Sequence, residues 1–204
     1  MNLIVFFNGW GMGDEVISKI KIPKDYKVIS LSFPYDLDVK ILKDFNEIIF
    51  IGWSFGVYYL SKFLANNEIK YSQVIAINGT PEIIGKNGIG ERVFDLTLRN
   101  MNEENLKKFY ENIGFISDDI HNKSIISLID ELKYLKDNYS PQKNFISKAI
   151  IGKEDKTIPY KNQKRYYKEK GTKIIEISAS RNTNFFIFIQ ELSSLYKEYV
   201  LLHN

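Results

Sequence analysis

The pentapeptide Gly52-Trp53-Ser54-Phe55-Gly56 has the residue types and spacing that nucleophilic catalysis requires. The apolar run 47–51 before it is typical of a buried strand, and residues 57–64 after it are typical of a helix. A G-x-S-x-G sequence between a strand and a helix forms a nucleophile elbow, in which the serine occupies a sharp, strained turn. The flanking glycines let strand and helix approach closely. The same pattern also occurs by chance in glycine-containing loops, but its context favours Ser54 as a nucleophile.

A second glycine-containing stretch, residues 8–12 (Asn-Gly-Trp-Gly-Met), follows the first predicted strand. Lipases and esterases place here a loop that donates a backbone N–H to the oxyanion hole. We expect the two donors to be the amides of Trp10 and of Phe55, the residue after the nucleophile. Losing one such donor typically lowers the rate by about 10²–10³. Gly9 and Gly11 can also simply shape a turn, and both roles are compatible because the donor uses only backbone.

A carboxylate follows the predicted strand that ends at Ile151, within the sequence Gly152-Lys153-Glu154-Asp155. In enzymes with a nucleophile elbow, the acid follows the serine in the chain and precedes the histidine. Asp155 is therefore the candidate acid, which would orient a histidine and stabilise its imidazolium. Glu154 is the alternative acid, and a solvated turn is the alternative to any catalytic role.

The histidine that should complete the triad is missing from its expected place after the last predicted strand. Residues 178–186 (Ser-Ala-Ser-Arg-Asn-Thr-Asn-Phe-Phe) contain no histidine, and Asn182 or Asn184 stands there instead. An asparagine amide has no nitrogen that accepts a proton near neutral pH. The two histidines of the chain, His121 and His203, fall in a predicted helical insertion and at the penultimate position. We expect a surface residue and a frayed end at these positions, not a catalytic base.

The elements that must position these residues alternate along most of the chain. Short, nearly continuous apolar runs predict buried strands, and the stretches between them predict helices. The predicted strands are 3–7, 27–31, 47–51, 73–78, 146–151 and 173–177, and the predicted helices are 14–19, 39–44, 57–66, 160–170 and about 185–201. This order predicts a mostly parallel, doubly wound sheet with functional loops at one sheet edge. Together with the nucleophile elbow, it predicts an α/β-hydrolase fold.

Residues 81–144 interrupt the alternation, because they contain no convincing strand. Amphipathic patterns predict three helices there, with Asn102 and residues 117–119 as N-terminal caps; the helices are 90–100, 103–113 and 123–138. We therefore predict one domain over residues 1–204. Its core comprises 1–80 and 145–204, and a helical lid is inserted at about 81–144.

The composition of the 204 residues excludes several other classes of protein. A net charge of +3, from 28 basic and 25 acidic residues, is too balanced to indicate a nucleic-acid binder. The chain has no cysteine and so no thiolate metal site, and we expect neither a metal nor a cofactor. We find no apolar run of membrane-spanning length and no signal-peptide pattern at the start. We therefore expect a cytoplasmic protein with no membrane partner.

At these residues the chain resembles the BioG family of pimeloyl-[acyl-carrier-protein] methyl ester esterases, small α/β-hydrolases of bacterial biotin synthesis. The similarity covers nearly the whole chain. Its most discriminating part is Asn78-Gly79-Thr80-Pro81 with Gly88-Ile89 and Thr97-Leu98; further matches are 6–12, 52–57, 152–155, Ile158-Pro159 and Asn162-Gln163.

The resemblance implies Ser54 as the nucleophile, Asp155 as the acid, and the Trp10 and Phe55 amides as oxyanion donors. The histidine of the family would fall near Asn182, and there this chain departs from the pattern. Two functions therefore stay open. One is a serine carboxylesterase of the BioG type, with its catalytic histidine replaced. The other is a catalytically impaired or non-enzymatic relative that binds an acyl ligand or an acyl-carrier protein.

The resemblance also implies a substrate and a partner, namely a pimeloyl methyl ester carried by an acyl-carrier protein. Such carriers are acidic, so basic side chains of the insertion could attract them: Arg92, Arg99, Lys107 and Lys108. A solvated charged face is the simpler interpretation of any single one of these residues. Aromatic residues such as Trp10, Trp53 and Phe55 could line an apolar slot for the acyl chain, although most aromatics at such spacing are core residues.

Overall fold

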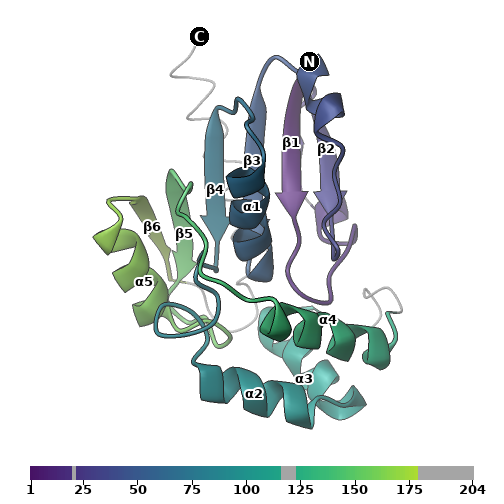
Figure 1. The fold of residues 1–204 in the computed structure, drawn as a ribbon, viewed down its shortest axis with the longest axis vertical. Helices are drawn as coiled ribbons and strands as arrows, with labels where there is room; N and C mark the ends of the chain where they lie inside the picture. Colours follow the sequence, from purple (N-terminus) through teal and green to yellow (C-terminus); the bar gives the residue numbers. More distant parts are fainter. Residues whose placement is uncertain (20–21, 116–122, 179–204) are drawn as a thin grey trace.

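The computed structural model describes residues 1–19, 22–115 and 123–178, and its centre is a six-stranded parallel sheet (Figure 1). The strand order is β2-β1-β3-β4-β5-β6, and every neighbouring pair is parallel. The strands are β1 (Asn2–Phe7), β2 (Tyr26–Leu31), β3 (Ile48–Trp53), β4 (Gln73–Ile77), β5 (Lys148–Gly152) and β6 (Lys173–Ile177). These strands confirm the predicted fold class and lie where the apolar runs predicted them.

The two long helices of the core follow β3 and β5. They are α1 (Phe55–Asn66), which packs on the sheet against β3 and β1, and α5 (Tyr160–Glu169). The predicted helices 14–19 and 39–44 are wrong in type, because these stretches form only the 3-10 helices η1 (Ile17–Lys19) and η2 (Val39–Asp44). Such short segments gain too few hydrogen bonds to offset the cost of nucleating an α-helix. The predicted helix 185–201 lies outside the described residues.

Strand β3 is the most deeply buried element of the sheet, since all six of its residues are buried. It pairs with β1 on one side and β4 on the other, and α1 covers one of its faces. Burial of each large apolar side chain of such a strand contributes about 1.5–3 kcal/mol. The strand that leads to Ser54 is therefore held in place on both edges.

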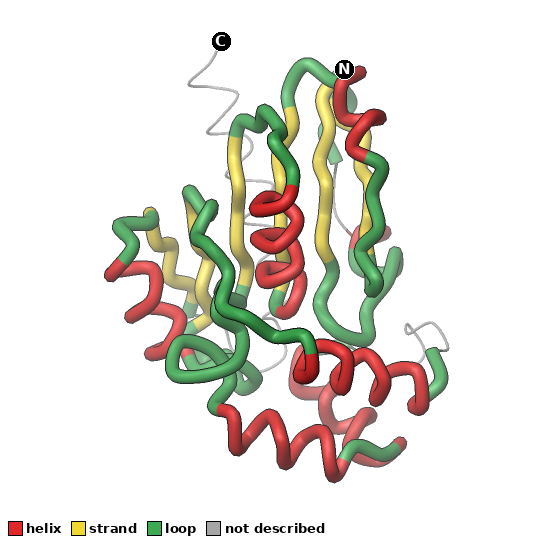
Figure 2. The backbone as a smooth tube through the Cα atoms, viewed as in Figure 1, coloured by secondary structure: helices red, strands yellow, loops and turns green. Residues whose placement is uncertain are grey.

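Three helices between β4 and β5 gather beyond the carboxyl ends of the central strands (Figures 1 and 2). They are α2 (Glu91–Asn100), α3 (Glu103–Ile113) and α4 (Ile125–Asp137), close to the predicted ranges. The Asn102 side chain caps α3 by accepting a hydrogen bond from the Asn105 N–H at 2.9 Å. Helix α4 is capped by Ser124, whereas the predicted cap at 117–119 lies outside the described residues. No helix in the described ranges is long and apolar enough to cross a membrane.

Helix α4 brings a carboxyl group into the interior of the protein. Glu131 is only 4% exposed, and it faces the phenol groups of Tyr35, Tyr59 and Tyr110. Burial raises the pKa of the Glu131 carboxyl to about 7, although the Lys123 ammonium opposes this shift. The folded protein therefore favours the protonated form of this side chain.

This burial predicts that ionisation of Glu131 destabilises the fold. An unfolded glutamate has a pKa of about 4.3, so the stabilising effect of the proton is complete below that pH and is lost as pH rises through about 7. We expect Glu131→Gln to be more stable than wild type by about 2 kcal/mol at pH 8, and to differ little at pH 4.5. Urea unfolding at the two pH values measures this. The exposed neighbour substitution Asp130→Asn is the control, and equal stability of Glu131→Gln and wild type at pH 8 would contradict the prediction.

Candidate active site

Ser54 forms the whole connection between β3 and α1. The strand ends at Trp53 and the helix begins at Phe55, so one residue reverses the direction of the chain. Ser54 has φ 54° and ψ −119°, a left-handed conformation that is strained for a residue with a side chain. Its N–H donates to the Ile77 carbonyl at 2.9 Å, and its own carbonyl accepts from Val57 at 3.1 Å. The neighbouring strand and helix therefore hold the strained turn.

Two glycines make this turn possible. A Cβ atom on Gly52 would lie 2.7 Å from Val57 Cα, and one on Gly56 would lie 2.0 Å from the Phe7 carbonyl oxygen. Both distances are far shorter than van der Waals contact with backbone atoms that cannot move aside. The G-x-S-x-G spacing is thus required by the close approach of β3, α1 and the end of β1.

The loop after β1 lies directly against Ser54. A Cβ on Gly9 would be 3.3 Å from Ser54 Cβ, so there is little space between loop and serine. The buried Asn8 side chain anchors the start of this loop by donating to Ser30 Oγ at 2.8 Å and to the Leu31 carbonyl at 3.1 Å. Loop 8–12 is thereby tied to β2 and its neighbouring turn.

Helices α3 and α4 hold the other side of this loop. The Trp10 indole N–H donates to the Leu128 carbonyl at 3.0 Å, and the Tyr110 hydroxyl donates to the Gly11 carbonyl at 3.1 Å. The Phe109 ring meets the Trp10 ring edge-on, with centroids 4.9 Å apart. No pattern in the sequence indicates these contacts, which join residues about a hundred positions apart.

The backbone amides of Trp10 and Phe55 find no acceptor in the described part of the chain. Among the described residues, neither N–H donates a hydrogen bond, although most buried amides in proteins are paired. Both residues line the same cavity as Ser54. Two unengaged donors beside a serine can stabilise negative charge that develops on a substrate carbonyl oxygen.

Asp155 lies on the turn after β5 and lines a small cavity of about 40 Å³ together with Ser54. One carboxylate oxygen accepts from the Thr157 and Ile158 amides at 2.8 and 3.0 Å, and the other accepts from Gln163 Nε2 at 3.0 Å. Burial raises the pKa of Asp155 to about 6, and these three hydrogen bonds oppose the rise. The alternative acid, Glu154, is exposed and does not line this cavity.

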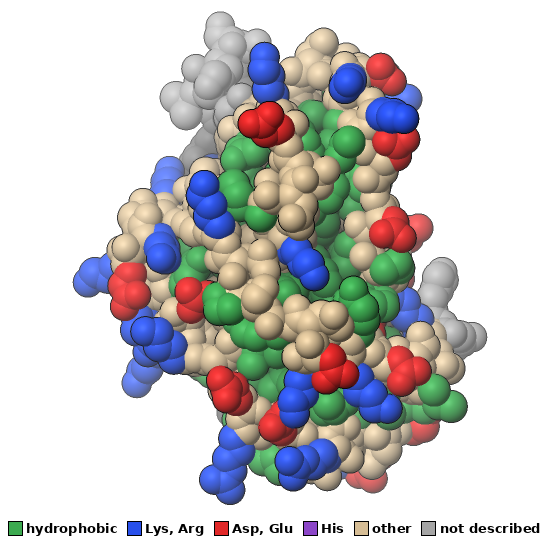
Figure 3. Space-filling view, viewed as in Figure 1, with side chains coloured by type: hydrophobic (Ala, Val, Ile, Leu, Met, Phe, Trp, Pro, Cys, Tyr) green, Lys and Arg blue, Asp and Glu red, His purple; other side chains and the backbone are tan. Residues whose placement is uncertain are grey.

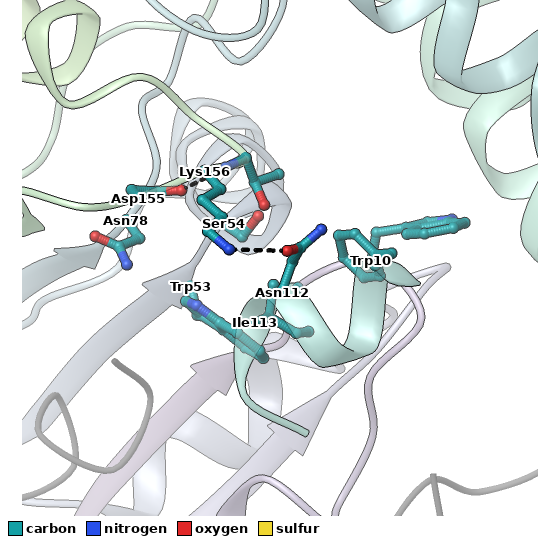
Figure 4. Close-up of a pocket in the computed structure, with 11 residues that line it drawn as sticks. Trp10, Trp53, Ser54, Asn78, Asn112, Ile113, Asp155 and Lys156 are labelled. Atoms are coloured by element: carbon teal, nitrogen blue, oxygen red, sulfur yellow. Dashed lines mark hydrogen bonds between the residues drawn. The ribbon is translucent and has the colours of Figure 1, made fainter. Parts of the chain in front are cut away.

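Two asparagines, Asn78 and Asn112, and one lysine, Lys156, complete the surroundings of Ser54 (Figure 4). Asn78, in a left-handed conformation after β4, accepts from the Gly152 N–H at 2.8 Å and so joins the ends of β4 and β5. Lys156 donates from Nζ to Asn112 Oδ1 at 3.1 Å, which connects the turn after β5 to α3. Figure 4 shows Asp155 and Asn78 on one side of Ser54 and Trp10 on the other. The resemblance included Asn78 without a role, and no pattern in the sequence indicates that Lys156 and Asn112 meet.

A larger and mainly apolar cavity of about 400 Å³ also opens at Ser54. Helices α2 and α3 supply much of its lining, including Phe94, Leu96 and Phe109, and α4 adds Leu132. The cavity can therefore receive a linear apolar group whose end lies at Ser54.

None of the described residues around Ser54 is a histidine. His121 and His203 both lie outside the described residues, as do Asn182 and Asn184 at the expected position of the base. In the described ranges, no group of histidine, aspartate or glutamate side chains could hold a metal ion.

A parallel sheet with a strained serine between its central strand and the following helix defines the α/β-hydrolase class. The family model described as "Pimeloyl-ACP methyl esterase BioG" matches residues 1–190. The chain therefore belongs to the BioG family, and the resemblance inferred from the sequence is confirmed.

Solved structures agree on the fold. The crystal structure of BioG from Haemophilus influenzae superposes with a TM-score of 0.77 at 21% identity, over 89% of each chain. A lipase-esterase related protein from Clostridium acetobutylicum gives a TM-score of 0.70 at 15% identity, over 97% of this chain and 93% of that one.

A curated relative is closer in sequence. It is a malonyl-[acyl-carrier protein] O-methyltransferase of Bacteroides fragilis, 33% identical over 181 residues, which are 81% of this chain and 36% of the relative. The chain spans about half the length or less of the curated relatives it matches. The methyltransferase name describes that whole protein, and its activity is not transferred to this chain.

The contacts of Asp155 predict that Gln163 keeps its carboxylate ionised. The Gln163 side chain is fully buried and donates to Asp155 and to the Ile158 carbonyl. Because a donor favours the charged form, Gln163→Leu should raise the pKa of Asp155 above about 6. Titration of the Asp155 carboxyl carbon by NMR measures this. Asn162→Ala is the control, since Asn162 donates to the Gly88 carbonyl instead, and an unchanged midpoint in Gln163→Leu would refute the positioning role.

Proposed function

We propose that the chain is a serine carboxylesterase-like member of its family that acts on the methyl ester of a carrier-bound acyl chain. The observation that carries this proposal is the strained Ser54 turn, beside which the Trp10 and Phe55 amides have no acceptor within residues 1–19, 22–115 and 123–178. Ser54 Oγ would attack the ester carbonyl carbon, and the two amides would hold the resulting oxyanion. Loss of methanol then leaves an acyl-serine, which water hydrolyses to the carboxylic acid.

This reaction requires a group that accepts the proton of the Ser54 hydroxyl when Oγ attacks. A histidine would accept it and pass it to the methanol leaving group, with Asp155 holding the imidazole in place. Residues 178–186 contain asparagine at 182 and 184 and no histidine. The chain should therefore hydrolyse esters slowly, since a site that lacks one triad member keeps only about 10³–10⁴ of rate over water.

The same absence supports a second candidate function. A relative that has lost its base, but keeps the apolar cavity beside Ser54, can bind an acyl ligand without turning it over. Both functions use the same cavity, so the level of Ser54-dependent turnover decides between them.

Hydrolysis of p-nitrophenyl butyrate by wild type, Ser54→Ala, Asn182→His and Asn184→His tests the proposal. We expect slow wild-type hydrolysis that Ser54→Ala abolishes. Restoring the base at its correct position should raise kcat/KM by about 10² or more, because general base catalysis typically contributes about 10²–10⁴. Labelling of Ser54 by a fluorophosphonate, detected by mass spectrometry, reports the reactivity of the serine independently of turnover.

Three outcomes are decisive. Wild-type hydrolysis that survives in Ser54→Ala would contradict the role of Ser54. Fast, Ser54-dependent hydrolysis by wild type would exclude the non-catalytic function. No gain in either histidine variant would mean that more than the base has been lost.

We further propose an acidic acyl-carrier protein as the partner. Helices α2 and α3 place exposed Arg92, Arg99 and Lys107 near the large cavity, whereas Lys108 pairs with Glu104 at 2.6 Å. Figure 3 shows basic and acidic side chains interspersed over the helices at this end of the molecule. The attraction should therefore be moderate and should come from a few unpaired cations.

Titration with an acyl-carrier protein at low and high salt tests this partner. Exposed charges are screened beyond about 10 Å at 0.1 M salt and about 3 Å at 1 M, so affinity should fall as salt rises. The double substitution Arg92→Gln/Arg99→Gln should weaken binding several-fold at low salt. Lys43→Gln on η2, away from the site, is the control. An affinity that ignores both salt and the arginine substitutions would count against this surface.

A further inference from the structure

Lys156 stands out as a cation at the junction of the two cavities beside Ser54. It lines both the small cavity that contains Asp155 and the 400 Å³ apolar cavity. Figure 4 shows its side chain extending past Ser54 toward α3. There the ammonium donates to Asn112 Oδ1 at 3.1 Å, so its position is fixed by a neutral amide.

Lys156 has no carboxylate partner among the residues that the structure describes. Lys108, the other lysine that lines the large cavity, pairs with Glu104 at 2.6 Å. Within residues 1–19, 22–115 and 123–178, Lys156 forms no salt bridge. The adjacent Asp155 carboxylate is already occupied by two backbone amides and Gln163.

The hydrogen-bonding capacity of Lys156 is also incompletely used. An ammonium group has three N–H donors, and Asn112 accepts from one of them. Two donors therefore remain without an acceptor among the described residues, on a side chain that lines both cavities. A ligand that suits this arrangement has one anionic group at the end of an apolar chain.

We infer that Lys156, held by Asn112, forms a carboxylate-binding position for a linear acyl chain that occupies the 400 Å³ cavity. The inference rests on the proposed function only for the origin of the ligand, because ester hydrolysis at Ser54 would generate such a carboxylate beside Lys156. The position distinguishes the charged acid from a neutral ester or amide. It retains the acid after hydrolysis in an esterase, and it selects the acid as ligand in a non-catalytic protein.

Binding of hexanoate and of the neutral hexanamide, measured by NMR titration of the full chain, tests this inference. The two ligands have the same chain length and differ in charge, and neither is an ester that the protein could consume. We expect hexanoate to bind about fivefold more tightly, a modest ratio because the Lys156 side chain is exposed. Lys156→Met should remove this preference, and Lys156→Arg should keep it. Asn112→Leu should reduce it, since the ammonium would lose its fixed position.

Lys108→Met is the matched control, because this lysine lines the same cavity but is already paired. The Lys108→Met variant should prefer hexanoate over hexanamide by the same factor as wild type. Equal affinity for the two ligands, a preference that survives in Lys156→Met, or no binding of either ligand at millimolar concentration would each overturn the inference. Fluorophosphonate labelling of Ser54 in the same samples reports separately on the proposed esterase function, so either can fail while the other stands.

Discussion

The site depends on one steric constraint, the close approach of β3, α1 and the end of β1 around Ser54. Glycine at positions 52 and 56 lets the backbones meet at distances that a Cβ atom would forbid. That contact forces the chain to reverse within one residue and holds Ser54 in a left-handed conformation. It also fixes the Phe55 amide at the start of α1, free of any acceptor in the described part of the chain. Strain at Ser54 persists because a fully buried strand and its helix determine the geometry on both sides.

Helices α3 and α4 are part of the site and do more than cover it. They hold loop 8–12 through the Trp10 indole, the Tyr110 hydroxyl and the Phe109 ring. Helix α3 also meets the turn after β5 through Asn112 and Lys156. A movement of these helices would therefore change the position of the Trp10 amide and the shape of the cavity at once. In the proposed esterase, substrate entry and oxyanion stabilisation would be coupled through the same contacts.

Neighbouring groups hold the Asp155 carboxylate in place, just as the strand and helix hold Ser54 in place. Asp155 is partly buried, desolvation raises its pKa to about 6, and two backbone amides and Gln163 orient it. Above that pH it carries a charge that suits a neighbouring imidazolium. The described residues thus combine a strained serine, two amides without an acceptor among them and an oriented carboxylate, whereas the sequence has asparagine at the expected position of the base. Either of the two proposed functions must account for a strained serine turn in a chain with asparagine at that position.

Local patterns in the sequence determined the strands, the fold class and the family, because apolar periodicity and the G-x-S-x-G spacing reflect constraints within a few residues. The same patterns failed for η1 and η2, where a short apolar-polar stretch does not distinguish a 3-10 turn from an α-helix. They also identified Ser54, Trp10, Phe55 and Asp155 as candidates, since each follows directly from a strand end. Only the tertiary structure brought Lys156 to Asn112, Trp10 to Leu128 and Gln163 to Asp155, and only it buried Glu131. These contacts arise from the packing of α3, α4 and α5 around the sheet edge, and no short-range pattern encodes how separate helices meet.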